Sequence, residues 1–496
     1  MADDLLSFIQ QKGFIWGPEP ELYGGLSGFY TYGPLGKLLK NRVEGHIRRF
    51  YQKNDFWEVE CPTIMPRVVW EASGHLTNFT DPVVKCTKCL AAFRSDNLIK
   101  ENFPDITDAD LADWHAHPAL LEKHNILCPK CKGHFGDDIT RHTLMMRTTV
   151  GLDVEAYNRP ETATTTYLPF IRYFDYFRKK LPFAVFQIGK AYRNEISPRQ
   201  HVLRMREFTQ AEAQIILFKD QKDSFEKYPD VAAKQLPLWT EEQQLEHKDH
   251  HAISCDAALQ KKLVGSKAYL WALAKTYEFF LSLGIPEENI RLRQHGKDEK
   301  AFYAIDAWDV EIKLNSFGWT ELCGVHDRGD YDLGQHEKNS KRNLKVSDET
   351  HKQELPHIIE IAFGTDRPVF ALLDLFYEKN EKEEAKSRFK IPIQVAPVQL
   401  AVFPLVNKEN LPDLAKDLYN SLMQYFICKY DSAGSIGRRY LREDEAGTAF
   451  CITVDFDTSK DGTVTVRERD TEKQIRVPMT QIKERLEKFF AGEPFG

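Results

Sequence analysis

The sequence has no long apolar run, and no stretch of its 496 residues approaches the ~20 apolar residues of a membrane-spanning helix. The opening residues, MADDLLSFIQQKGF, carry acidic side chains where a secretory signal peptide carries basic ones. Internal repeats and low-complexity segments are also absent. We therefore expect a soluble, cytoplasmic protein with no membrane partner.

An excess of positive charge is also lacking. Lysine and arginine number 67 against 74 aspartates and glutamates, so the net charge is −7 and gives no general attraction to nucleic acid. Any nucleic-acid partner must therefore be met by local basic patches. With 42% hydrophobic and 28% charged residues the composition is that of a globular protein, and the length suggests about three domains.

Cysteines are too few and too scattered for a disulfide framework. Nine are present, and five stand alone in strand-like or helical contexts, which is typical of a reducing compartment. These five are Cys61, Cys255, Cys323, Cys428 and Cys451.

The remaining four cysteines, Cys86, Cys89, Cys128 and Cys131, form two CxxC pairs separated by 38 residues. Two thiolates on one tight turn occupy adjacent corners of a tetrahedron, and two such turns complete it. A redox dithiol is the alternative, but two matching pairs favour zinc. Because all four corners are protein ligands, we expect a structural zinc ion rather than a catalytic one.

Periodicity predicts an amphipathic helix over 35–53, followed by a half-buried strand over 56–61. Residues 218–265 are polar and are predicted to be an irregular insertion. A helix is expected over 266–284, and residues 379–397 are the best candidate for a linker. After it, alternating strands and helices, including a helix over 411–429, predict a module of about a hundred residues.

The stretch AYRNEISPRQHVLRMREFTQAEA, residues 191–213, contains four arginines and three glutamates between two apolar strand-like segments. Its Ser-Pro turn signal predicts an antiparallel hairpin. In an extended strand Arg193 and Glu195 share a face, as do Arg204, Arg206 and Phe208 on the return strand. Guanidinium groups, a carboxylate and an aromatic ring on one face suit a polyphosphate that carries a flat base.

The segment HIIEIAFGTDRPVFALLDLF, residues 357–376, reads as an apolar strand, a glycine and then a helix. This junction brings Arg367 to the first helical turn, where backbone amides also favour anions.

Together these features resemble the three signature motifs of class II aminoacyl-tRNA synthetases: a helix leading to a strand that ends in proline, a hairpin carrying RxE and RxREF, and a strand and helix carrying GxxxR. In detail, the sequence over residues 12–480 resembles the glycyl-tRNA synthetases of the dimeric, archaeal and eukaryotic type. The matching segments are YGGLSGFYTYGP, SGHLTNFTDP, NRPETAT, RNEISPR, REFTQAE, IRLRQH, WDVEI, DRGDYDL and ITVDFDT.

The resemblance implies an α+β fold with an antiparallel-sheet catalytic core, a zinc-ribbon-like insertion and a C-terminal α/β anticodon-binding domain. The implied boundaries are 1–85 and 141–385 for the core, 86–140 for the insertion and 392–496 for the last domain. It further implies ATP-dependent activation of glycine, its transfer to tRNA(Gly), and a homodimer.

Residue by residue, the resemblance implies that Arg193 binds the α-phosphate of ATP, Glu195 the adenine amino group and Arg204 the terminal phosphates. Phe208 would stack on adenine opposite Arg367, and Arg193, Glu195 and Arg367 would be catalytic. Glu321 would bind Mg²⁺. The whole set implied for ATP is Arg193, Asn194, Glu195, Arg204, Met205, Phe208, Glu321, Leu322 and Arg367.

For glycine, the resemblance implies that Glu161, Glu212 and Glu360 surround the ammonium group, with Arg94 near the carboxylate and Ala362 in the pocket. Two departures from the family are visible. The family usually has RPETAQG, and here Thr164 and Thr165 stand in its last two places. Ala362 stands where serine is usual.

In the C-terminal module, GRRYLREDEAGTAF is interpreted as a basic loop that presents Arg438, Arg439 and Arg442 to tRNA. Two other functions remain open for the chain. One is a non-catalytic binding subunit, like the accessory subunit of a mitochondrial DNA polymerase. The other is a class II synthetase for another small amino acid, which only the pocket residues would separate from a glycine enzyme.

Overall fold

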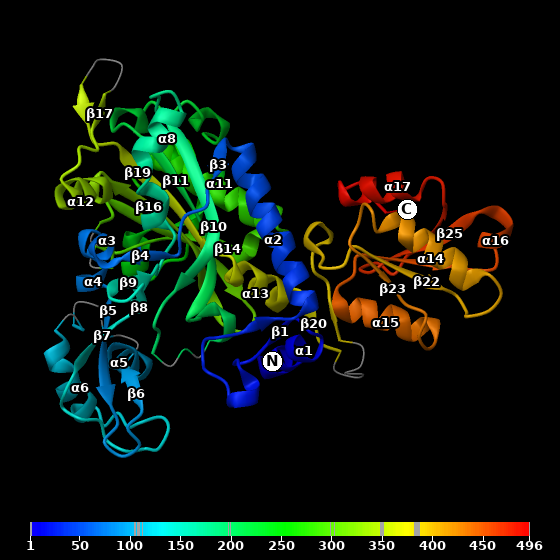
Figure 1. Cartoon of the computed structure of the whole chain (residues 1–496), viewed down its shortest axis with the longest axis horizontal. Helices are drawn as coiled ribbons and strands as arrows, with labels where there is room; N and C mark the ends of the chain where they lie inside the picture. Colours follow the sequence, from blue (N-terminus) through cyan, green and yellow to red (C-terminus); the bar gives the residue numbers. More distant parts are fainter. Residues whose placement is uncertain are drawn as a thin grey trace.

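A nine-stranded sheet is the centre of the largest part of the chain (Figure 1). Its order is β13-β12-β14-β15-β16-β19-β11-β10-β3, and all neighbours are antiparallel except β12–β14 and β10–β3. The strands are β3 Phe56–Glu58, β10 Phe183–Tyr192, β11 Glu207–Leu217, β12 Gln235–Trp239, β13 His251–Ser254, β14 Ile290–Gln294, β15 Asp306–Leu314, β16 Gly318–Gly329 and β19 His357–Gly364.

This is a computed structural model of the chain. It describes residues 2–495 except 104–105, 107–109, 112, 197, 199, 298, 302, 348–351 and 381–386. Six residues of the predicted linker therefore lie outside the described part. None of the described helices is both long and apolar enough to cross a bilayer.

Helices cover one face of the sheet. α11, Lys267–Ser282, packs against β15, β16 and β19 and is apolar nearly all round, as expected of a buried helix. α2, Pro34–Lys53, confirms the helix predicted over 35–53 and lies beside α11 in Figure 1. Its first turn approaches the preceding chain closely, because a Cβ on Gly36 would lie 1.8 Å from the carbonyl oxygen of Phe14.

The opposite face carries short helices and a second small sheet. That sheet has the order β4-β9-β8. Its strands and the nearby elements are β4 Ile64–Pro66, β8 Met146–Val150, β9 Val154–Asn158, α3 Arg67–Ala72, α4 His75–Asn78, α7 Ala163–Tyr167, α8 Phe170–Tyr176 and α12 Tyr331–Ser340. The helix α13, Asp366–Leu375, packs against α2 instead. The peripheral elements are α1 Ala2–Gln11, β1 Ile15–Trp16, β2 Thr31–Tyr32, β17 Val346–Ser347, β18 Gln353–Glu354, β20 Tyr377–Glu378 and β21 Arg388–Phe389.

Two expectations about this part were wrong. The strand predicted over 56–61 ends at Glu58, after which the chain leaves the sheet. The segment 218–265 is not irregular, because β12 and β13 add two strands at the edge of the main sheet. One helix lies between these strands in the chain, and a second follows β13. These helices are α9 Glu241–Leu245 and α10 Cys255–Gln260.

The cysteine-bearing unit projects from the core and has its own apolar centre (Figure 1). Its described residues form a three-stranded sheet of order β6-β5-β7 and the helices α5 and α6. These elements are β5 Thr80–Lys85, β6 Ala92–Arg94, β7 Thr140–Thr143, α5 Ser95–Asn102 and α6 His117–Lys123.

The C-terminal part has a separate core around a sheet of order β23-β22-β24-β25-β26, parallel over its first three strands and antiparallel beyond. Its elements are β22 Leu400–Pro404, α14 Leu411–Leu422, β23 Cys428–Tyr430, α15 Ile436–Ala446, β24 Phe450–Val454, α16 Thr458–Asp461, β25 Thr463–Glu468, β26 Gln474–Pro478 and α17 Ile482–Phe490. The helix predicted over 411–429 ends at Leu422, and the predicted basic loop is the helix α15.

Candidate active site

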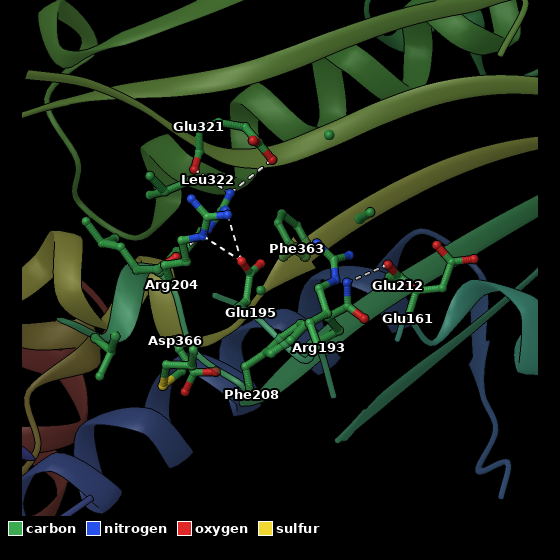
Figure 2. A pocket seen from close by; sticks show the side chains of 18 of the residues that line it. Glu161, Arg193, Glu195, Arg204, Phe208, Glu212, Glu321, Leu322, Phe363 and Asp366 are labelled. Atoms are coloured by element: carbon green, nitrogen blue, oxygen red, sulfur yellow. Dashed lines mark hydrogen bonds and ion pairs between the residues drawn. The ribbon is translucent and has the colours of Figure 1, made fainter. Parts of the chain in front are cut away.

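A cavity of about 160 Å³ opens over β11, β19 and β16, on the face of the sheet opposite α11. Side chains on this face alternate along each strand, and the antiparallel register aligns them in rows. Two successive rows are Glu212, Ala362 and Gly324, then Gln214, Glu360 and His326. In Figure 2, Glu161 and Glu212 lie at one end of the cavity, and Glu195 and Arg204 lie toward the other.

The cavity brings together the residues predicted for ATP and for glycine, except Asn194 and Arg94. Those that line it are Glu161, Arg193, Glu195, Arg204, Met205, Phe208, Glu212, Glu321, Leu322, Glu360, Ala362 and Arg367.

The predicted hairpin is confirmed, because β10 and β11 pair antiparallel from Phe183 opposite Ile216 to Tyr192 opposite Glu207. The charged residues lie in the connection beyond the paired strands. Glu195 is buried there and accepts from Nε of Arg204 at 2.8 Å. The guanidinium group of Arg193 lies 5.4 Å from the ring centre of Phe208.

Arg367 stands in the first turn of α13, as predicted from the strand and helix junction. Its Nη1 donates to the backbone carbonyl of Glu321 at 2.8 Å and lies 3.0 Å from the Oε1 atom of the same residue. The Arg367 charge lowers the pKa of Glu321, so this carboxylate is an anion that can bind a cation. An oxygen ligand of this kind suits Mg²⁺.

Two arginines lie elsewhere than expected: Arg94 was expected near the carboxylate of glycine, and Arg206 on the same face as Arg204 and Phe208. Arg94 does not lie with the three glutamates; it pairs with Asp81 at 3.1 Å and with Asp96, in the cysteine-bearing unit. Arg206 turns out of the cavity and donates to the carbonyl oxygens of Ser27 and Glu195. The chain bends at residues 204 and 206 before β11 begins at Glu207, so strand alternation does not apply to Arg206.

Asn194, the other predicted ATP residue outside the cavity, is held through its backbone. Its amide donates to Leu144, and its carbonyl lies 2.8 Å from Nε2 of His142. It lines a neighbouring hollow instead.

Glu212 lies at the carboxylate end of the cavity and is almost fully buried. Its oxygens accept from the Thr162 hydroxyl at 2.5 Å and from the Gln210 amide at 2.9 Å. Burial, followed by the charges of Glu360 and Glu161, raises the pKa of Glu212 to about 8. The neutral acid therefore predominates at pH 7 until a cation enters the cavity.

Glu360 and Glu161 have cationic or hydrogen-bonding neighbours instead. Glu360 is 3.1 Å from Nη1 of Arg328 and 3.0 Å from Nδ1 of His326, and Glu161 is 3.5 Å from Nε2 of His75. For Glu360, burial favours the neutral acid, but Arg328 and His326 outweigh it and lower the pKa. Burial is likewise outweighed at Glu161, where His75 and Arg328 lower the pKa.

Sequence reasoning missed several charged residues that build this end of the cavity. Arg328 is buried and links Glu360 to Asp332. The Nε atom of Arg328 donates to Oδ2 of Asp332 at 2.6 Å. It stands within the DRGDYDL segment, so the motif held a signal that the sequence reading left unused. His326 lines the cavity, and no sequence pattern distinguished it.

The two threonines that depart from the family pattern are both used. The Thr164 hydroxyl donates to Glu161 at 3.0 Å. The Thr165 hydroxyl accepts from Arg159 and from Gln187, each at 3.1 Å.

The four predicted cysteines come together, and their sulfur atoms all lie within 4.8 Å of one another. Cys86 and Cys131 are 3.5 Å apart, and Cys89 and Cys128 are 3.7 Å apart. A tetrahedral site with ~2.3 Å metal–sulfur bonds has sulfur–sulfur edges of about 3.8 Å, so this cluster could hold a metal ion. A Cβ on Gly133 would lie 3.2 Å from the Cys86 sulfur, so the turn packs tightly on the cluster.

The predicted tRNA-binding arginines stand on α15, and they differ in exposure. Arg439 is buried, and its Nη2 donates to the carbonyl of Gly434 at 2.8 Å, so it cannot present its guanidinium to RNA. Arg438 is exposed. Arg442 is exposed and hydrogen-bonded to Asp431 at 3.0 Å.

Comparison with known proteins agrees with this geometry. Residues 152–376 match the tRNA synthetase class II core domain (G, H, P, S and T), and residues 399–489 match an anticodon binding domain. Among curated proteins, a glycine–tRNA ligase from Methanococcus maripaludis is 36% identical, over 97% of this chain and 98% of the relative. The chain belongs to the glycine–tRNA ligase family.

Other members of the family are similar over their whole length. The glycine–tRNA ligase of Methanocaldococcus jannaschii is 37% identical, over 98% of this chain and 99% of its own. That of Thermococcus kodakarensis is 36% identical, over 97% of both chains. The chain is therefore an aminoacyl-tRNA synthetase with the class II core and the anticodon domain that the motifs implied.

Proposed function

We propose that this chain activates glycine with ATP to form glycyl-adenylate and transfers the glycyl group to the 3′ end of tRNA(Gly). The observation that supports this proposal most is the cavity itself. Three glutamates at one end are matched to an ammonium group, and an aromatic ring with several arginines at the other is matched to a nucleotide. Apart from its ammonium group, glycine has only a carboxylate as a polar group. With the ammonium group at the glutamate end, this carboxylate points along the cavity toward the phosphates.

The reaction needs positioning and positive charge more than a protein nucleophile. The amino-acid carboxylate attacks the α-phosphorus, the bond to the bridging oxygen breaks, and pyrophosphate leaves with its charge. Arg193 lies between the two ends of the cavity, where the α-phosphate would sit, and its guanidinium stabilises the charge that builds there. Arg204 and Arg367 would bind the terminal phosphates and the adenine face.

Magnesium, bound through Glu321, would supply further charge neutralisation for the departing pyrophosphate. The protein's own part is to keep Glu321 ionised, and Arg367 does so. In the transfer half-reaction, the terminal ribose hydroxyl of tRNA attacks the adenylate carbonyl and AMP leaves.

The alternative of a non-catalytic binding subunit is disfavoured, since such a relative has no need to keep an ATP-binding set. Here Arg193, Glu195, Phe208, Glu321 and Arg367 all line one cavity. The proposal is tested by charging unfractionated tRNA with each labelled amino acid. Label from glycine should become acid-precipitable and alkali-labile. Charging with alanine or serine alone would remove the glycine assignment.

We also propose that the four cysteines hold a structural Zn²⁺ ion and that the insertion predicted over 86–140, together with the strands β5 and β7 that complete its sheet, acts as a separate zinc-binding unit. Protein purified without chelators should carry about one zinc ion per chain, which the double variant Cys86→Ser, Cys128→Ser should lack. Absence of zinc from the parent protein would refute the proposal. Because the unit has its own apolar core, the rest of the fold should survive the loss of the ion.

Finally, we propose a symmetric homodimer. Its support is a set of exposed apolar side chains on α3 and on the β4-β9-β8 sheet with its β8–β9 turn, which follow in the chain after α2 and β3, the helix and strand of the first class II motif. These are Ile64, Val68, Val150, Leu152 and Val154, with exposed fractions between 42% and 100%. Light scattering at micromolar concentration should give twice the chain mass, and a monomeric mass would contradict the proposal.

A further inference from the structure

The floor of the cavity at the amino-acid end is formed by residues with very small side chains. Gly324 and Ala362 are cross-strand neighbours on β16 and β19, and both line the cavity. The family's usual serine hydroxyl is missing at Ala362, so the floor offers little that could exclude the methyl group of alanine. A single methyl group is worth about 10- to 200-fold in discrimination, and only when the pocket wall is in place.

The wall at this point is the imidazole of His326. His326 lies two residues from Gly324 on the same strand and therefore on the same face. A Cβ on Gly324 would lie 2.7 Å from Cε1 and 3.1 Å from Nε2 of His326. The ring thus folds back along β16 and already fills the space over Gly324.

The ring is also fixed beside the group that binds the substrate ammonium. Its Nδ1 lies 3.0 Å from Oε1 of Glu360, and the ring of Tyr303 meets it edge-on at 6.4 Å between centres. Glu360 is held from other sides by Arg328 and Gln214, each at 3.1 Å. An ammonium group hydrogen-bonded to that Oε1 lies at most about 5.8 Å from Nδ1. The substrate Cα is one bond further on, so it lies within about 7.3 Å of Nδ1.

We infer that the His326 imidazole is the specificity-determining wall of the glycine pocket, occupying the space over Gly324 that the side chain of alanine or serine would need. This inference rests on the proposed function, because it concerns the same pocket and the same reaction. His326 acts in two ways: its volume excludes a side chain, and its hydrogen bond orients Glu360.

The test is amino-acid-dependent exchange of pyrophosphate into ATP, measured as kcat/KM for glycine, L-alanine and L-serine. In His326→Ala the glycine-to-alanine ratio should fall at least 10-fold, mainly because kcat/KM for alanine rises. His326→Asn keeps an amide beside Glu360 but is smaller than imidazole, so its ratio should fall by at least ~5-fold. This variant carries the test where the alanine variant does not fold.

His295 offers a matched control. Its ring lies 6.3 Å from that of His326 and is hydrogen-bonded to Asp309, but it does not line the cavity. His295→Ala should leave the glycine-to-alanine ratio within 2-fold of the parent. A ratio within 2-fold of the parent in both His326 variants overturns the inference, and so does an equal fall in the His295 variant.

Failure of the proposed function has a different signature. A parent protein that exchanges with alanine or serine faster than with glycine overturns the glycine assignment before any variant is compared. A parent that prefers glycine, together with unchanged ratios in the His326 variants, overturns only the role of His326.

Discussion

Lys40 in α2 forms an ion pair with Asp366, the first residue of α13, and both side chains are almost completely buried. The same carboxylate accepts from the Tyr32 hydroxyl at 2.7 Å and from the Thr209 amide at 2.8 Å. Asp366 precedes Arg367, and Thr209 follows Phe208. This network therefore fixes the two residues predicted to enclose adenine relative to the long helix α2.

Replacing Lys40 by methionine should be strongly destabilising, because it leaves Asp366 buried without its cation. The expected loss is about 3–5 kcal/mol in the free energy of unfolding. Lys37 is a matched control on the same helix, since it lies 3.9 Å from Glu44 and is half-exposed, so Lys37→Met should cost at most ~1 kcal/mol. Urea denaturation measures both. Equal stabilities of the two variants would show that the pair does not hold the helix.

Removing Arg193 or Arg367 should lower the rate of adenylate formation by at least ~100-fold, the scale for losing a preorganised charge beside the reacting group. Lys190 serves as a control, because it stands on the same hairpin but pairs with Glu207 at the surface. Lys190→Ala should retain nearly the parental rate. Pyrophosphate exchange at saturating glycine is the measurement. Rates within a few-fold of the parent for both arginine variants would mean that the hairpin does not bind ATP.

Glycine binding should strengthen as the pH rises through about 8. Burial, with Glu360 and Glu161 nearby, raises the pKa of Glu212 to about 8, so this group is mostly neutral below that pH and anionic above it. An ammonium group binds the anion, and affinity therefore follows ionisation of Glu212. The ionised fraction of a group with this pKa rises from about 3% at pH 6.5 to about 76% at pH 8.5, so the apparent KM for glycine should fall roughly 25-fold over this range. Glu212→Gln should remove this dependence.

The same shift predicts the sign of a stability effect. The folded chain keeps a proton on Glu212 that the unfolded chain loses near its ordinary pKa, so folding binds a proton between about pH 4.5 and 8. The contribution of Glu212 to stability is fully present below that window and is lost as the pH rises through it. Added glycine should raise the melting temperature more at pH 8.5 than at pH 6.5. The opposite trend would contradict the assignment of Glu212.

Local patterns predicted those parts of the fold in which residues close in sequence determine the outcome. The helix over 35–53 and the charged hairpin have strong periodicity and turn signals, and both are confirmed. The strands β12 and β13 were missed, because each is short and flanked by polar residues. Their pairing partners, β14 and each other, supply the stability that the local sequence does not indicate.

The candidate site shows the same limit. Its glutamates and hairpin arginines follow recognisable motifs, whereas Lys40 and Asp366 are 326 residues apart, and nothing local marks them as partners. Arg94 was misplaced because its neighbours Asp81 and Asp96 bind it within the cysteine-bearing unit. His326 gained its position only through the register of β16 with β19.

The arginines of α15 should separate into two classes. Arg438 is exposed, and Arg438→Ala should raise the KM for tRNA by about 10-fold, the scale of one charge-assisted hydrogen bond, without affecting pyrophosphate exchange. Arg439 is buried on backbone carbonyls, so Arg439→Ala should destabilise the C-terminal part by about 1–3 kcal/mol. Aminoacylation kinetics and thermal melting distinguish the two. An unchanged KM for tRNA in Arg438→Ala would exclude Arg438 from the RNA contact.

The most direct measurement of the central claim is ATP–pyrophosphate exchange by the purified chain with each amino acid in turn. Exchange needs only the cavity, ATP, Mg²⁺ and the amino acid, so neither tRNA nor the C-terminal arginines can obscure the result. Glycine should support the fastest exchange at equal concentration, and Glu212→Ala should abolish it while ATP binding persists. Faster exchange with alanine or serine than with glycine would contradict the account.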